Sequence, residues 1–146
     1  MAKTRVCVLF GGVSSEHEIS LLSASSVIQN IPADKYEIIC VGITRKGRWL
    51  YYPGDVSLIA NGEWESHPDC TTAVLSVDRT HKGLIKIMSD GETSVLHIDC
   101  IFPVLHGRNG EDGTIQGLFT IAGIPYVGCD TLSSAVCMDK AFTHTV

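Results

Sequence analysis

The chain has 146 residues, of which 45% are hydrophobic and 18% charged, and its formal net charge is −5. This composition is typical of one well-packed soluble domain, and the acidic balance, with no basic cluster larger than Arg45–Arg48, argues against a nucleic-acid partner. The apolar runs are strand-length and the N-terminus lacks a signal-peptide pattern, so we expect no membrane association and a cytoplasmic location.

The first predicted elements form a β-α-β unit. Arg5–Phe10 is a continuous apolar run that ends at two glycines, as expected of a buried parallel strand that enters a turn. Ser15 and Glu18 have the spacing of a capping box for a helix over residues 16–31, which Pro32 then ends. Tyr36–Thr44 is the next buried strand, and the crossover between the two strands is expected to be right-handed.

The middle of the chain, residues 45–93, is rich in turn residues and predicts short strands instead of long helices. Its clearest feature is an Asp90-Gly91 turn between the apolar segments Leu84–Met88 and Ser94–Ile98, which predicts a β-hairpin. We interpret this region as a β-rich insertion and not as a second domain.

The last part of the chain returns to alternating strands and helices. Asp99–Val104 predicts a buried strand, Thr114–Ala122 a helix that Gly123 ends, and Pro125–Val127 a short strand. Ser133–Met138 predicts a further helical turn. The whole pattern indicates an α/β fold: an open, mainly parallel sheet flanked by helices.

Ligands of open α/β sheets bind beyond the carboxyl ends of the strands, and two polar loops lie at such positions. The first, Gly11–Glu18, carries Glu16 at the start of a helix. That carboxylate either only complements the helix dipole or faces the cleft and binds a ligand ammonium group. The loop lacks the glycine spacing of a dinucleotide-binding motif.

The second loop, Leu105–Gly113, is unusually polar for a plain connection. His106 is either a structural histidine or a group that orients or polarises a carboxylate. Glu111 is a further candidate, whereas for Asp112 we favour a role as a cap of the following helix. The cysteines and histidines show no spacing typical of a metal site, so no metal ligand is assigned.

Four segments, taken together, resemble the D-alanine–D-alanine ligases. They are GGxSxEHExS at residues 11–20, FPVLHGxxGEDGTxQG at 102–117, PYxG at 125–128 and SAxxMDK at 134–140. Residues 124–140 are most similar to a branch that includes the D-alanine–D-serine ligases of vancomycin resistance.

The resemblance implies an N-terminal, Rossmann-like (pre-ATP-grasp) substrate-binding domain over residues 1–130 and the start of an ATP-grasp region over residues 131–146. In this family, ATP phosphorylates the first D-alanine and the second attacks the acyl phosphate, which gives the dipeptide of the peptidoglycan precursor. By the family pattern, Glu16 binds the first ammonium group. His106, as the candidate catalytic residue, and Glu111 line that substrate, and Lys140 contacts the ATP phosphates.

The resemblance further implies D-alanine and ATP as substrates, Mg²⁺ as the metal and a homodimer. Most ATP contacts and the Mg²⁺ ligands of the family follow the segment that ends at Val146, so we expect this chain by itself to be inactive. Two alternatives remain open: a domain of a D-alanine–D-serine ligase, and a small-molecule-binding module without catalytic activity.

Overall fold

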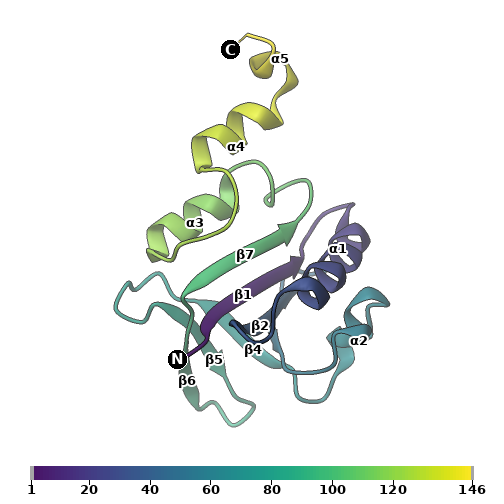
Figure 1. The fold of residues 1–146 in the computed structure, drawn as a ribbon, viewed down its shortest axis with the longest axis vertical. Helices are drawn as coiled ribbons and strands as arrows, with labels where there is room; N and C mark the ends of the chain where they lie inside the picture. The colour runs from purple at the N-terminus through teal and green to yellow at the C-terminus, as the bar shows by residue number, and fades with distance from the viewer. Residues whose placement is uncertain (1, 146) are drawn as a thin grey trace.

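A computed structural model describes residues 2–145 and contains a seven-stranded sheet with helices on both faces (Figure 1). The strands are β1 (Thr4–Gly11), β2 (Tyr36–Ile43), β3 (Trp49–Tyr52), β4 (Thr71–Leu75), β5 (Gly83–Ile87), β6 (Thr93–His97) and β7 (Cys100–Leu105). The helices are α1 (His17–Asn30), α2 (Ser57–Ala60), α3 (Thr114–Ala122), α4 (Thr131–Met138) and α5 (Lys140–Thr143), with a 3-10 turn at Glu63–Ser66.

The sheet is mixed and mostly antiparallel, so the prediction of a mainly parallel sheet was wrong. Its strand order is β6-β5-β4-β3-β2-β1-β7, and β1 pairs in parallel with β2 and β7. The other four pairings are antiparallel. The reason is the insertion. Three of its pairings, β2–β3, β4–β5 and β5–β6, follow connections too short for a parallel crossover. The fourth, β3–β4, is also antiparallel, although a longer segment with α2 and the 3-10 turn joins its strands. The strands of the insertion extend the main sheet from the edge of β2 and do not form a sheet of their own.

The predicted hairpin is confirmed as β5 and β6, which pair over their full lengths around Gly91 with φ 86°. The first helix is also confirmed, but its capping box is not. Glu16 occupies the N-cap position without a side-chain hydrogen bond to the helix. Glu18 instead forms an exposed ion pair with Arg45.

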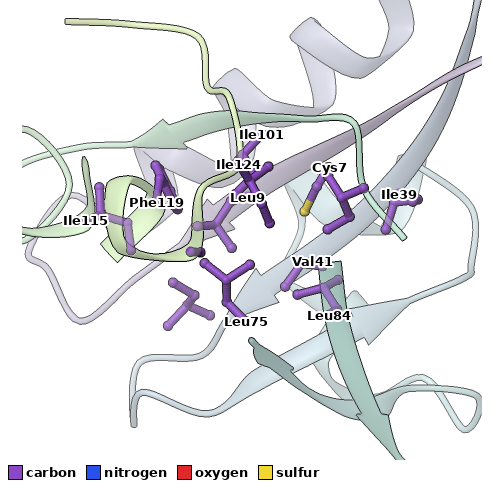
Figure 2. Packing of buried hydrophobic residues seen from close by; sticks show 13 residues of the cluster. Cys7, Leu9, Ile39, Val41, Leu75, Leu84, Ile101, Ile115, Phe119 and Ile124 are labelled. Atoms are coloured by element: carbon purple, nitrogen blue, oxygen red, sulfur yellow. The ribbon is translucent and has the colours of Figure 1, made fainter. Parts of the chain in front are cut away.

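Side chains alternate between two cores along the buried strands, as the period of two in a strand requires. On β1, Val8 and Phe10 face the core covered by α1 and α2, whereas Cys7 and Leu9 face the core covered by α3. Figure 2 shows this second core, where Leu9 lies among side chains from α3 and from the insertion strands. The sheet is therefore the middle of three layers, and the insertion contributes to the α3 core.

The end of the chain is less regular than its beginning. The predicted strand at Pro125–Val127 is a single parallel bridge between Tyr126 and Ile101. The predicted helical turn is the longer helix α4, capped by Asp130, whose carboxylate accepts from the Ser133 amide. Among residues 2–145, no helix is long and apolar enough to cross a membrane.

Candidate amino-acid-binding site

The two polar loops lie side by side because β1 and β7 are parallel neighbours whose carboxyl ends point the same way (Figure 1). The chain leaves β1 at Gly11 with φ 88°, a conformation that strongly favours glycine. A Cβ atom at this position would also lie 2.2 Å from the Ile43 carbonyl oxygen. The glycine therefore lets the first loop turn tightly against β2.

A buried serine joins the ends of the two strands. The Ser20 hydroxyl, on α1, accepts a hydrogen bond from the Gly11 amide at 2.7 Å. It also donates to the Val104 carbonyl of β7. Because Gly11 begins the first loop and Val104 directly precedes the second, this hydroxyl links the starts of the two loops.

The second loop is held in shape by its own acidic side chains. Glu111 Oε2 accepts from the Gly107 amide at 2.6 Å. Asp112 accepts from the Asn109 amide at 2.9 Å and from the Thr114 amide, at the start of α3, at 3.0 Å. The N-cap position of α3 is Gly113, without a side-chain cap, so the prediction that Asp112 caps this helix was wrong. Burial raises the pKa of the Asp112 carboxyl, but the hydrogen bonds together lower it by more. The pKa therefore lies below its ordinary value.

Three of the sequence-predicted residues come together where the loops meet. One ligand atom from each of Glu16, His106 and Glu111 lies within 4.8 Å of the others. The two glutamates are exposed and the histidine is half-buried. Close approach depends on Gly107, because a Cβ atom there would lie 3.3 Å from the Glu16 carboxylate.

Helix α1 supplies the side chain, Ser23, that orients the imidazole of this cluster. His106 Nε2 lies 3.2 Å from the Ser23 hydroxyl, close enough for a hydrogen bond. Two carboxylates and an imidazole can attract an ammonium group or, in another protonation state, hold a divalent metal ion. Within residues 2–145 this is the one cluster of three such side chains that could share an ion.

Two cavities flank the second loop. One of about 290 Å³ opens between the Gly11–Ser14 turn and His106. The other, of about 400 Å³, lies between Glu111, Gln116 and helix α4. A larger cavity of about 540 Å³ lies near the start of β1, but its described lining has no Asp, Glu, His, Lys or Arg side chain. We therefore place the candidate site at the loops.

Lys140, the fourth predicted residue, does not join the cluster. It is exposed and begins the short helix α5, which follows α4 away from the sheet (Figure 1). Neighbouring Asp139 caps α5 by accepting from the Ala141 and Phe142 amides.

Sequence reasoning missed three residues that support the site: Ser20 as the link between strands, Ser23 beside His106, and Gln116 behind the second loop. One signal for the serines was available, because residues 16, 20 and 23 share one face of a helix. Gln116 gave no such structural signal, since a single polar residue in an amphipathic helix is ordinarily exposed. Its signal was its place among the named residues of the 102–117 segment that resembles the ligases.

The family model described as "D-ala D-ala ligase N-terminus" matches residues 5–129. The chain belongs to this family. Both candidate loops lie inside the matched segment, and Lys140 lies outside it.

Relatives of known name agree with this membership. The D-alanine–D-alanine ligase of Caldicellulosiruptor bescii is 54% identical over 142 residues, which are 97% of this chain and 38% of that protein. The VanG D-Ala:D-Ser ligase from Enterococcus faecalis is 48% identical with a TM-score of 0.92, over 99% of this chain and 41% of its own. The Bacillus anthracis D-alanine–D-alanine ligase complexed with ATP is 30% identical with a TM-score of 0.58, over 97% and 34%. The chain thus spans about two fifths or less of these ligases.

Proposed function

We propose that this chain binds the first D-alanine in an ATP-dependent D-alanine–D-alanine ligase that makes the peptidoglycan precursor dipeptide. The observation that carries the proposal is the cluster of Glu16, His106 and Glu111, whose ligand atoms lie within 4.8 Å of one another. An amino acid offers an ammonium group and a carboxylate. The two glutamates attract the ammonium group, and the imidazole is a partner for the carboxylate.

In this proposal Glu16 is the direct partner of the ammonium group. Its carboxylate is exposed beside His106 and Glu111, and its own amide donates to the Ser14 hydroxyl at 3.1 Å. Glu111 is already bonded to the Gly107 amide through one oxygen, so it closes the site from the other side. His106, fixed by Ser23, orients the substrate carboxylate for attack on the terminal phosphate of ATP.

ATP and Mg²⁺ are the proposed co-substrate and metal. Mg²⁺ prefers oxygen ligands in octahedral geometry, so a cluster that contains an imidazole does not suit it. We propose that the Mg²⁺ ligands and most ATP contacts belong to the further length found in the relatives. Residues 131–146, which follow the family match, would begin that ATP-grasp region, with Lys140 as a point charge for phosphate.

The second amino acid is proposed to be D-alanine, in keeping with the Caldicellulosiruptor relative. D-serine is the second candidate, and the similarity to VanG D-Ala:D-Ser ligase favours it. Mass spectrometry of the products formed from an equal mixture of the two amino acids distinguishes them. We also propose that the ligase is cytoplasmic and forms a homodimer. Sedimentation of the full-length ligase tests the dimer: a monomer at high concentration argues against it.

The test is a pair of matched glutamate variants in the full-length ligase that carries this chain. Glu16→Gln keeps the shape but loses the charge that holds the ammonium group, so we expect kcat/KM for D-alanine to fall about 10- to 100-fold. KM for ATP should stay within about twofold, since Glu16 is not an ATP contact in the proposal.

Glu18→Gln is the control, because Glu18 lies two residues away and pairs with Arg45 outside the cluster. It should leave kcat/KM for D-alanine unchanged. If the parent enzyme shows no D-alanine-dependent ATP hydrolysis, the proposed function is wrong. If the two variants change kcat/KM for D-alanine equally, Glu16 does not bind the ammonium group and only begins the helix.

A further inference from the structure

Gln116, in the first turn of α3, has a buried side-chain amide in which only one of the two polar atoms has a hydrogen-bond partner. It is 7% exposed, and its Nε2 donates to the Gly110 carbonyl at 2.9 Å. Its Oε1 is the one buried side-chain nitrogen or oxygen without a partner among residues 2–145. A buried acceptor without a donor destabilises a fold, so this side chain needs an explanation.

The orientation of the amide follows from its neighbour. A flipped side chain would set Oε1 against the Gly110 carbonyl oxygen, and two acceptors cannot share a hydrogen bond. The Gly110 carbonyl therefore determines that the amide nitrogen faces the loop. The hydrogen bond to Gly110 is retained although it leaves Oε1 unpaired.

This hydrogen bond acts on the peptide unit that leads into Glu111. The carbonyl of that unit is Gly110 oxygen, which Gln116 binds, and its amide is Glu111 nitrogen, which donates to the Gly107 carbonyl at 3.0 Å. The peptide is thus held on both of its sides. A peptide plane fixed in this way places the Cα atom of Glu111 and so restricts where its side chain can leave the backbone.

The packing around Gly110 explains why the loop needs such a support. Gly110 is buried, and a Cβ atom there would lie 2.6 Å from Cβ of Leu105. The loop therefore lies directly on the end of β7, and a glycine at this point gives its backbone more freedom than any other residue would. Without a partner for the Gly110 carbonyl, that freedom would let the Glu111 carboxylate move away from the cluster.

We propose that Gln116 is a positioning residue for the first-substrate site. It binds the Gly110 carbonyl, and through the Gly110–Glu111 peptide it keeps the Glu111 carboxylate beside Glu16 and His106. The inference rests on the proposed function, because it assigns the role of that carboxylate to binding of the first amino acid. It adds a residue from outside the two loops to the determinants of that site.

The experiment compares two variants of the same helix in the full-length ligase. Gln116→Met has a similar length but cannot donate to Gly110. Thr120→Val, one turn further on, removes only a hydroxyl that donates to the Gln116 backbone carbonyl at 2.9 Å. Where Gln116→Met does not fold, Gln116→Glu replaces it, since it has the same shape and lacks the amide donor.

We expect Gln116→Met to raise KM for the first D-alanine about tenfold, as loss of one positioning hydrogen bond would, with KM for ATP within about twofold. Thr120→Val should change neither constant. An unchanged KM for D-alanine would overturn the proposal. An equal rise in KM for ATP would also overturn it, because that result indicates general damage to the fold.

Amide hydrogen exchange of Glu111 gives a second readout that needs no activity. The Gly110–Glu111 peptide should move in Gln116→Met, so that the Glu111 amide exchanges at least about tenfold faster than in the parent or in Thr120→Val. Equal exchange rates would overturn the positioning role. A parent enzyme that does not use D-alanine would refute the proposed function, and the exchange rates would still decide whether Gln116 holds Glu111.

Discussion

Replacement of Ser20 by alanine should weaken the junction between β1 and β7 and leave helix α1 intact. The hydroxyl is fully buried, accepts from the Gly11 amide at 2.7 Å and donates to the Val104 carbonyl. Alanine removes both hydrogen bonds and deprives two backbone groups of this partner, each at a cost of about 1–3 kcal/mol. Alanine also favours the helix slightly, so we expect the free energy of unfolding to fall by about 2–4 kcal/mol.

Urea denaturation of the purified protein, followed by far-ultraviolet circular dichroism, measures this difference. Ser26→Ala is the matched control, because Ser26 lies on the same helix with an exposed side chain. Its effect should stay within about 0.5 kcal/mol. If Ser20→Ala and Ser26→Ala unfold at the same urea concentration, the serine bridge contributes nothing and the reasoning is refuted.

Two further predictions concern ionisable groups. Burial raises the pKa of the Cys40 thiol to about 12, whereas Cys137 is exposed. Iodoacetamide at about pH 8 should therefore modify Cys137 at least about 100-fold faster than Cys40, as peptide mass spectrometry measures. Comparable rates for the two cysteines would show that the core opens readily. The Arg5 amide, which donates to Asp99, holds the pKa of that carboxyl below its ordinary value, so its contribution to stability is present above about pH 4 and is lost as the pH falls through the lowered pKa. Asp99→Asn should therefore lose less stability on acidification than the parent, and identical acid unfolding curves would contradict the assignment.

The central strands and helices were predictable because their sequences carry the period of one structural type. Val6–Phe10 is continuously apolar because β1 is covered on both faces, by α1 and by α3. The direction of the sheet was not predictable to the same degree. Leu50 and Tyr51 pair with Thr72 and Thr71 across a long connection, and no local pattern records which strand edge such a segment will join.

In the candidate site, too, some residues were predictable from the sequence and others were not. Glu16, His106 and Glu111 lie in polar, glycine-rich loops at strand ends, where chemistry is expected from topology. Ser20 and Gln116 are buried polar residues on otherwise amphipathic helices, and their importance depends on backbone groups that only the folded chain brings near. Residues that contact the ligand can thus be inferred from sequence more readily than those that hold them in place.

The pairing of β1 with β7 also has a consequence for the order of folding. Ser20 and Val104 are 84 residues apart in the sequence, so the pairing closes a long loop and is entropically costly until the insertion has joined the sheet. An intermediate that contains only β1, α1 and β2 would present Glu16 without His106 or Glu111. An amino acid that needs all three side chains would bind only the domain in which β1 and β7 are paired. By mass action it would therefore stabilise that pairing.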